Sequence, residues 1–162
     1  MNEQTFSRLV EEHQETLYRV AYTLIRHPED CRDILQDALI SAWRNIHTLR
    51  NPEAFRGWMI RIVVNCAKNA LRKKKIQTVE LTGDLSAPEN RTEDENLAFA
   101  LLQLRESLRL PIVLYYMESL SVEEISRVMR LPKGTIKNRL FRGRKMMAEI
   151  LNQCQKEEKA WS

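Results

Sequence analysis

Hydrophobic residues recur at intervals of three and four positions along three stretches in the first half of the chain, which is the spacing of an amphipathic α-helix. The first stretch covers residues 9–25, the second follows the sequence HPED, and the third starts at Phe55. Their apolar stripes are Val10, His13, Leu17, Val20, Ala21 and Leu24; Leu35, Ala38, Leu39, Ala42 and Ile46; and Phe55, Trp58, Met59, Ile62, Val63, Cys66 and Ala70. The third stretch predicts the clearest helix, because polar side chains line its opposite face.

Helical periodicity is lost after Lys75 and resumes at Leu97. The stretch between them collects Gly83, Pro88 and acidic residues, which is the composition of a linker. The pattern therefore predicts an all-α protein with two small helical domains, over residues 1–75 and 97–155. A flexible acidic linker over residues 76–96 joins them, and residues 156–162 form a tail.

A helix-turn-helix is predicted in the second domain. A helix from near Ser107 to about Ser119 accommodates Pro111, because the first-turn amides of a helix lack partners within it. The sequence SVEE, which starts at Ser121, fits a capping box and begins the next helix. After the turn MRLPKG, one stripe of the last helix is apolar and the opposite one is mostly polar. The apolar stripe consists of Ile136, Leu140, Gly143 and Met147. The opposite stripe consists of Thr135, Asn138, Phe141, Arg142 and Lys145.

The composition is that of a globular protein, with 162 residues of which 43% are hydrophobic and 30% charged. The three cysteines lie far apart, the histidines form no metal-binding motif, and the four glycines form no phosphate-binding loop. We therefore expect no catalytic residue, metal, cofactor or small-molecule substrate. The sequence shows no secretion signal and no membrane-spanning run, so we expect a cytoplasmic protein.

The net charge of +4 is unevenly distributed, because two basic blocks flank an acidic middle. The C-terminal block, residues 133–145, contains Lys133, Lys137, Arg139, Arg142, Arg144 and Lys145 and no acidic residue. A basic helix is often only solvated surface. Phe141 on the charged face is poorly explained by solvation, however, and suits contact with a thymine methyl group in the major groove. Binding to duplex DNA is therefore favoured.

The second basic block covers residues 54–79 and suits a phosphate backbone. It contains Arg56, Arg61, Lys68, Arg72, Lys73, Lys74 and Lys75. Asn65 and Asn69 share its polar stripe, and Trp58 lies one turn before Arg61, which is a combination suited to unpaired bases. Trp58 is equally well explained as a core residue at helical spacing, with only its edge at the surface.

An acidic stripe formed by Asp30, Asp33 and Asp37, beside Gln36, would repel DNA. It is either solvated surface or a docking site for a protein partner, and composition does not decide between the two.

Three motifs, in this order and spacing, resemble the extracytoplasmic-function (ECF, group IV) sigma factors of the bacterial sigma-70 family. They are CRDILQDALISAWRN, AFRGWMIRIVVNCAKNALRKKK and LSVEEISRVMRLPKGTIKNRLFRGRK. The resemblance implies a σ2 domain over residues 1–75 and a σ4 domain over residues 97–155, which bind core RNA polymerase and read the −10 and −35 promoter elements. It also implies restraint by an anti-sigma factor, often membrane-bound.

The resemblance also implies roles for individual residues. Docking on the coiled coil of the polymerase β′ subunit falls to Asp33, Gln36 and Asp37. Contacts with the −35 duplex fall to Thr135, Lys137, Asn138, Arg139, Phe141 and Arg142. Contacts with the melted −10 element fall to Trp58, Arg61, Asn65, Lys68, Asn69 and Arg72, with the loop from Thr48 to Glu53 taking up a flipped base.

Three positions depart from the usual family pattern. Arg130 occupies the helix-turn-helix turn, where glycine is common, and a left-handed arginine would cost on the order of 1 kcal/mol. Arg105 stands where the family often has proline. Gly143 replaces a more usual alanine, and on the stripe with Ile136 and Leu140 it would permit close helix packing.

Two other functions compete with this one. A helix-turn-helix repressor or activator would bind duplex DNA without polymerase, but it leaves the second basic block and the acidic stripe unexplained. An adaptor would use its basic helices to bind an acidic protein or RNA, and it would be indifferent to DNA sequence.

Overall fold

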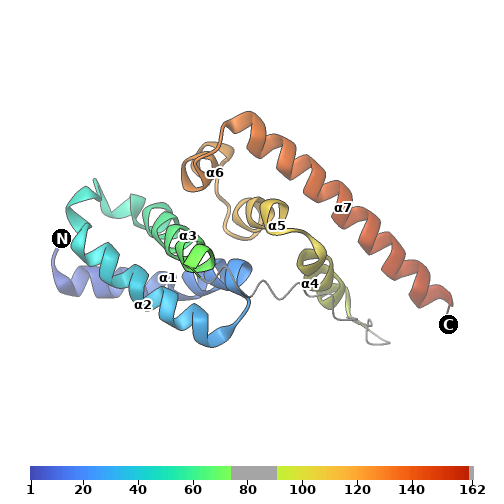
Figure 1. Cartoon of the computed structure of the whole chain (residues 1–162), viewed down its shortest axis with the longest axis horizontal. Coiled ribbons are helices and arrows are strands. Elements are labelled where there is room, and N and C mark those ends of the chain that lie inside the picture. The colour runs from blue at the N-terminus through green and yellow to red at the C-terminus, as the bar shows by residue number, and fades with distance from the viewer. Residues whose placement is uncertain (74–90, 161–162) are drawn as a thin grey trace.

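The computed structural model describes residues 1–73 and 91–160, and every regular element in these ranges is a helix. The expected all-α fold is therefore confirmed. One group comprises α1 (Glu3–Ile25), α2 (Pro28–Arg44) and α3 (Phe55–Lys73). The other comprises α4 (Glu93–Gln103), α5 (Glu106–Ile112), α6 (Val122–Met129) and α7 (Lys133–Ala160). Figure 1 shows the two groups side by side. Most of the predicted linker, with Lys74 and Lys75, lies outside the described residues.

Local signals set the ends of the first helices. Asn2 caps α1, because its side-chain oxygen accepts a hydrogen bond of 2.8 Å from the amide of Thr5. Arg26 ends the helix in the left-handed conformation, with φ of 58°. Pro28 is the first residue of α2, where its missing N–H costs nothing. The predicted break at HPED is confirmed.

The core of the first group forms where α3 packs on α1 and α2. Phe55, Met59, Ile60 and Val63 of α3 are completely buried, as are Val20 and Ala21 of α1 and Ala38 and Ala42 of α2. These are positions of the predicted apolar stripes, apart from Ile60. Two short 3₁₀ turns, Ile46–Thr48 and Pro52–Ala54, connect α2 to α3. They hold the loop from Thr48 to Glu53 at one end of α3.

Helix α4 begins at Glu93, earlier than the expected start at Leu97. Thr92 and Glu95 form a capping box, in which the threonine side chain accepts from the Glu95 amide at 3.2 Å and the glutamate accepts from the Thr92 amide at 3.0 Å. Three of the acidic residues that suggest a linker in the sequence, Glu93, Asp94 and Glu95, lie in the first turn. There they interact favourably with the positive end of the helix dipole.

The expected helix from near Ser107 to about Ser119 is present as a helical segment from Glu106 to Met117, but it changes type within this segment. Helix α5 ends at Ile112, and residues Val113–Met117 continue as a π-helix. Pro111 lies inside α5, beyond its first turn, so its missing N–H removes a helical hydrogen bond. The chain continues with wider bonds, such as the one of 3.1 Å from the Glu118 amide to the Val113 carbonyl.

The predicted helix-turn-helix is present in α6 and α7. Ser121 and Glu124 form the expected capping box at the start of α6. Arg130 ends α6 with φ of 56° and ψ of 44°, which is the strained left-handed conformation anticipated at this position. The turn is tied together by Ser126, whose hydroxyl donates to the carbonyl of Leu131. Lys133 Nζ also lies 3.7 Å from Glu123 Oε1 across it.

Gly143 packs closely on α5, as expected from its place on the apolar stripe of α7. A Cβ added there would lie 2.9 Å from Ile112 Cγ1. Helix α7 continues to Ala160, through part of the predicted tail, and it contacts α4 as well as α5 and α6. Cys154, near its end, is buried.

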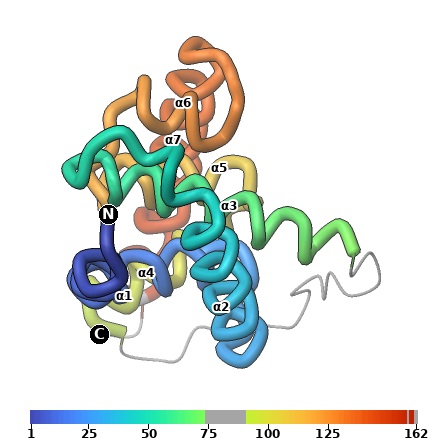
Figure 2. Tube along the Cα trace, turned by 90° about the vertical axis from the view of Figure 1, so that its left-hand side faces the viewer, coloured from blue at the N-terminus to red at the C-terminus, as the bar shows by residue number. Residues whose placement is uncertain are grey.

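The two helical groups pack directly on each other. Helix α1 contacts α5, and α3 contacts α6. Figure 2 gives a side view, with α6 at the top and α1 and α2 below. Arg109 of α5 is buried, and its Nε donates to the Thr23 carbonyl of α1 at 3.0 Å. Burial lowers the pKa of Arg109, and the nearby charge of Arg26 lowers it further. Among residues 1–73 and 91–160, none of the helices is long and apolar enough to cross a membrane.

Candidate nucleic-acid interface

The outward face of α7 carries the residues assigned to duplex DNA. Ile136 and Leu140 turn inward and are buried, which fixes the rotation of the helix. The outward side chains then include Lys137, Asn138, Phe141 and Arg142, which are exposed, with Thr135 and Arg139 half-buried beside them. Phe141 is 61% exposed, so its ring is available to a ligand rather than to the core. The structure thus brings all six predicted residues to the first half of one helix.

Two of the basic residues in this block contact other side chains of the same domain. Arg144 Nη1 donates to the Tyr116 hydroxyl at 2.9 Å. Lys133 is paired with Glu123 across the turn. The pKa of Glu123 is lowered by its own backbone N–H at the start of α6 and then by Lys133. These contacts brace α7 against its own domain and leave the face around Arg142 outward.

The polar face of α3 carries the residues assigned to the −10 element. Arg61, Asn69 and Arg72 are exposed, and Asn65 and Lys68 are half-buried. The buried stripe of the helix lies opposite, against α1 and α2. A row of cationic and amide groups therefore runs along the outer side of α3.

Trp58 links α3 to the loop that precedes it. The indole is half-buried, with its ring centroid 6.0 Å from that of Phe55. Its Nε1–H donates to Thr48 Oγ1 at 3.0 Å, and that hydroxyl donates to the Asn45 carbonyl at 2.8 Å. The ring thus packs on the core, as one sequence interpretation holds, while its edge reaches the loop from Thr48 to Glu53.

Arg56 does not join the outer row, although it belongs to the second basic block. Its Nη2 lies 3.3 Å from Glu118 Oε2, in the junction between the helical groups. A phosphate contact by Arg56 is therefore not favoured in this arrangement. Nothing in the local sequence around Glu118 signals this pairing, because the partners are 62 residues apart.

The acidic stripe lies on the outer face of α2. Asp33, Gln36 and Asp37 are exposed, whereas Asp30 is half-buried with an oxygen 3.6 Å from His27 Nδ1. Burial raises the pKa of the Cys66 thiol on α3, and the charge of Asp37 raises it further.

Two apolar residues that the sequence interpretation omitted extend the acidic face. Ile40 and Trp43 are 48% and 43% exposed, and they follow Gln36 at helical spacing. The signal available in the sequence is that Ile40 lies off the inward apolar stripe of α2. An acidic surface with exposed apolar neighbours is suited to a protein partner rather than to DNA.

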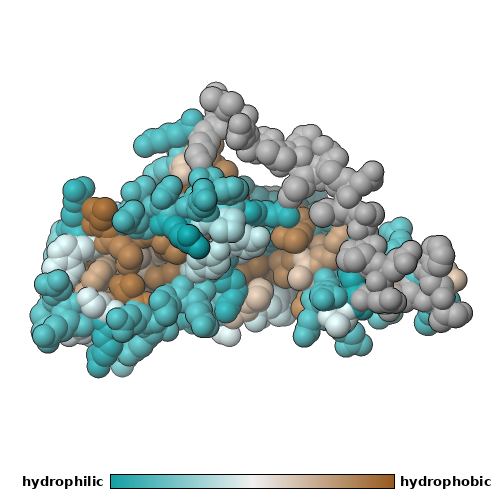
Figure 3. All heavy atoms as spheres, turned by 90° about the horizontal axis from the view of Figure 1, so that it is seen from below, coloured by the Kyte–Doolittle hydropathy of each residue, from teal (hydrophilic) through white to brown (hydrophobic). Residues whose placement is uncertain are grey.

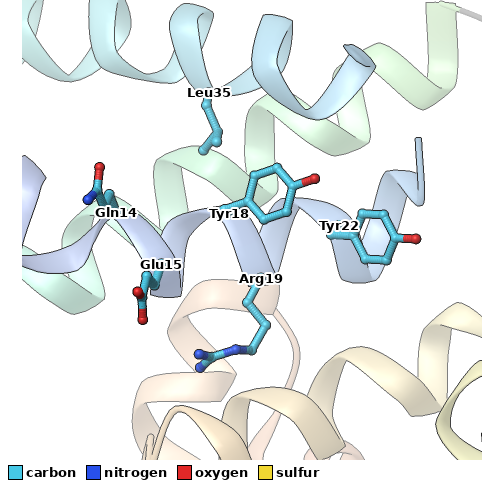
Figure 4. A pocket seen from close by; sticks show the side chains of 6 residues that line it. All are labelled: Gln14, Glu15, Tyr18, Arg19, Tyr22 and Leu35. Carbon is cyan, nitrogen blue, oxygen red and sulfur yellow. The ribbon is translucent and has the colours of Figure 1, made fainter. Parts of the chain in front are cut away.

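A shallow hollow of about 580 Å³ lies between α1 and α2. Figure 3 shows hydrophobic residues gathered between hydrophilic borders on the underside of the molecule. The hollow is lined by Gln14, Glu15, Tyr18, Arg19, Tyr22 and Leu35. In Figure 4, Arg19 points away from Leu35 and toward the C-terminal helices. The side chains of residues 1–73 and 91–160 form no group of three or more potential metal ligands.

Two family regions match the chain. Residues 9–76 match Sigma-70 region 2, and residues 94–147 match Sigma-70 region 4. The first contains α2 and α3, and the second contains the helix-turn-helix.

Curated relatives match along most of the chain. It is 32% identical over 144 residues to RNA polymerase sigma factor SigV of Bacillus subtilis (strain 168), covering 85% of this chain and 86% of the relative. It is also 32% identical to the ECF RNA polymerase sigma-E factor of Escherichia coli (strain K12), over 164 residues, covering 88% of this chain and 84% of the relative.

Solved structures share the fold. The sigma factor RpoE of Bartonella quintana, solved with the anti-sigma factor NepR, superimposes with a TM-score of 0.75 at 22% identity, covering 91% of this chain and 96% of that one. CnrH, solved with the cytosolic domain of CnrY, gives a TM-score of 0.68 at 23% identity, covering 94% and 90%. With the two regions in order and relatives at this identity, the chain belongs to the ECF group of the sigma-70 family of RNA polymerase sigma factors.

Proposed function

We propose that this sigma factor divides promoter recognition between its two basic faces. The outward face of α7 binds the −35 duplex, and the polar face of α3 holds the melted −10 element. The acidic face of α2 docks on the coiled coil of the polymerase β′ subunit. The observation that carries the proposal is that these three faces lie on separate helices and each is directed outward.

At the −35 element, the first half of α7 is suited to the major groove. Asn138 and Arg142 are of the types that bond base edges, and Lys137 is suited to a phosphate. Phe141 is exposed enough to contact a thymine methyl group. Thr135 and Arg139 complete the surface from half-buried positions. The side chains braced against the protein, such as Arg144, hold the helix rather than read the sequence.

At the −10 element, the chain supplies groups for a separated strand. Arg61 and Arg72 attract phosphates, Asn65 and Asn69 bond unpaired base edges, and Lys68 lies between them. A flipped base enters the loop from Thr48 to Glu53, whose start is fixed by Trp58. Energy for strand opening comes from binding unpaired bases rather than from nucleotide hydrolysis, so the protein acts as a binding factor and not as an enzyme.

At the polymerase, Asp33, Gln36 and Asp37 provide the docking face, and Ile40 adds apolar area beside them. The exposed position of all four is compatible with a protein partner. Because bacterial core polymerase is a cytoplasmic enzyme, we place the sigma factor in the cytoplasm. RpoE of Bartonella quintana was solved with an anti-sigma factor, and we propose that an anti-sigma factor, anchored in the membrane, restrains this chain as well.

The proposal is tested by adding the purified chain to bacterial core RNA polymerase and mapping transcript starts on genomic DNA. Core alone and core with a chain carrying Asp33→Lys and Asp37→Lys serve as controls. We expect discrete starts that share upstream −35 and −10 sequences, and their loss with the variant. Tight duplex binding by the free protein, without association with core, would instead show a helix-turn-helix regulator that acts without polymerase.

A further inference from the structure

Glu118 is buried at the junction between the two helical groups. Only 1% of its side chain is exposed, although it follows the exposed end of the π-helical segment. Its Oε1 lies 2.6 Å from Arg19 Nη1 of α1, and its Oε2 lies 3.3 Å from Arg56 Nη2 of α3. The same Arg56 nitrogen donates to the Glu118 carbonyl. One carboxylate of the C-terminal group is thus held by two arginines of the N-terminal group.

A second polar contact reinforces the junction one helical turn further along α1. The Thr23 carbonyl accepts from Arg109 Nε, and Arg109 Nη1 donates to the Leu104 carbonyl at 3.1 Å. The Thr23 hydroxyl donates to the Arg19 carbonyl at 2.7 Å, so both contacts start from the same side of α1. The junction is therefore built from specific polar partners around the buried side chains of Glu118 and Arg109, and not from casual surface contact.

The packed arrangement brings the two DNA-facing helices close together. Helix α6 contacts both α3 and α7, so a single helix separates them. Packed helix axes lie about 10 Å apart, which places α3 and the start of α7 on the order of 20 Å from each other. The −10 and −35 elements are separated by about 25 base pairs, or about 85 Å at about 3.4 Å per base pair. One packed chain cannot contact both elements at once.

We infer that the junction of Glu118 with Arg19 and Arg56 is a latch that holds the sigma factor in a closed form. This inference rests on the proposed function, because it assumes that α3 and α7 serve the two promoter elements. The latch opens when the helical groups separate on polymerase, and only the open form spans a promoter. The closed form shields the Glu118 carboxylate from water and keeps α6 against the helix that holds the −10 element.

The chemistry of the junction makes such a latch reversible. Opening returns the buried carboxylate to water and completes the hydration of two guanidinium groups that are already partly exposed, and this recovered hydration offsets most of the lost pairing. Removing only the arginines has a different effect, because the closed form then keeps a buried carboxylate without its partners. Substitution of the arginines should therefore favour the open form strongly, while the intact latch stays easy to open.

The test measures the distance between the helical groups in the full chain. Spin labels are attached at Glu11→Cys on α1 and Arg127→Cys on α6, two exposed positions on helices of different groups, after Cys31, Cys66 and Cys154 are replaced by alanine. Distance distributions are recorded by electron paramagnetic resonance for the free chain and for the chain bound to core polymerase. Circular dichroism checks that every variant keeps its helices.

For the free chain we expect one short distance, and for the complex with core a longer one. The Arg19→Ala/Arg56→Ala variant should raise the ratio of open to closed molecules about tenfold. This increase is smaller than for a fully buried ion pair, because both arginines are partly exposed. Glu118→Gln should shift the ratio in the same direction. Arg8→Ala is the matched control, because Arg8 pairs with Glu12 within α1 at 3.8 Å, and it should change nothing.

A closed distance that is unchanged in both the arginine and the Glu118→Gln variants would overturn the latch. A short distance that persists on core polymerase would overturn it as well. Failure of the proposed function gives a different result, because the variants would then still open the free chain while the start-mapping experiment yields no promoter-specific transcripts.

Discussion

Gly143 of α7 faces Ile112 of α5 at a separation that leaves no room for a side chain. A Cβ at this glycine would lie 2.9 Å from Ile112 Cγ1 and 3.1 Å from Cδ1. Alanine would gain about 1 kcal/mol of helix propensity, but overpacking against the stiff, branched isoleucine costs about 1 to 3 kcal/mol. We predict that Gly143→Ala lowers the free energy of unfolding in urea by about 1 kcal/mol.

The residue at position 112 decides whether Gly143→Ala raises or lowers the free energy of unfolding. In a chain carrying Ile112→Ala the obstructing atoms are gone, so Gly143→Ala should there raise the free energy of unfolding. A double-mutant cycle measures the coupling between the two positions. Equal effects of Gly143→Ala in both backgrounds would show that the close approach to Ile112 does not govern packing at this site.

Arg130 has a left-handed backbone at the turn of the helix-turn-helix, with φ of 56°. Arg130→Gly removes the strain of this conformation but loosens the unfolded chain, so we predict a net gain of about 0.5 to 1 kcal/mol in the free energy of unfolding. Arg127→Gly, inside α6, is the matched control and should lose about 1 kcal/mol. A loss at both positions would mean that the Arg130 side chain stabilises the turn.

Trp58 positions the loop that starts at Thr48 through its Nε1–H. Trp58→Phe keeps an aromatic ring beside Phe55 but removes this donor, which is worth about 1 kcal/mol. We predict that discrimination among bases in the −10 element falls about three- to tenfold, with −35 duplex binding unchanged. Thr48→Ser keeps the hydroxyl and serves as the control. Undiminished discrimination in Trp58→Phe, or an equal loss in Thr48→Ser, would contradict this role.

Arg142 is exposed on the outward face of α7, whereas Arg144 donates to Tyr116. If Arg142 reads a base, Arg142→Ala should weaken holoenzyme binding to a matched −35 duplex by about 1 to 3 kcal/mol and flatten the preference at one position. A phosphate contact would instead give a sequence-independent loss and a shallower salt dependence. Arg144→Ala should have the smaller effect. No change from Arg142→Ala would refute the docking of this helix face.

Local motifs predict most of the helices, and the failures have physical causes. The capping box at Ser121 is followed by a strong apolar stripe and predicts α6 correctly. The same motif at Thr92 is interpreted as linker, because acidic residues surround it and only the helix dipole makes them favourable there. The sequence accommodates Pro111 near the start of one helix, and no local pattern indicates that the chain continues after Ile112 as a π-helix.

The candidate site is likewise predicted only in part from the sequence. The outward faces of α3 and α7 follow from periodicity, because the buried stripe of each helix fixes which side is exposed. The burial of Glu118 does not follow, since its partner Arg19 is 99 residues away and no local pattern encodes how two helical groups pack. Ile40 is not predicted as part of the acidic face, because charged and polar residues alone define that face in the sequence.

The most direct test of the divided recognition is open-complex formation on one mapped promoter, with an intact −10 element and with one melted in advance by mismatches. We expect the Asn65→Ala/Lys68→Ala variant to be deficient on the intact promoter and largely restored on the melted one. Arg142→Ala should stay deficient on both, because its contact lies in the −35 duplex. Rescue of Arg142→Ala by melting, with no rescue of the α3 variant, would contradict the assignment of the two faces.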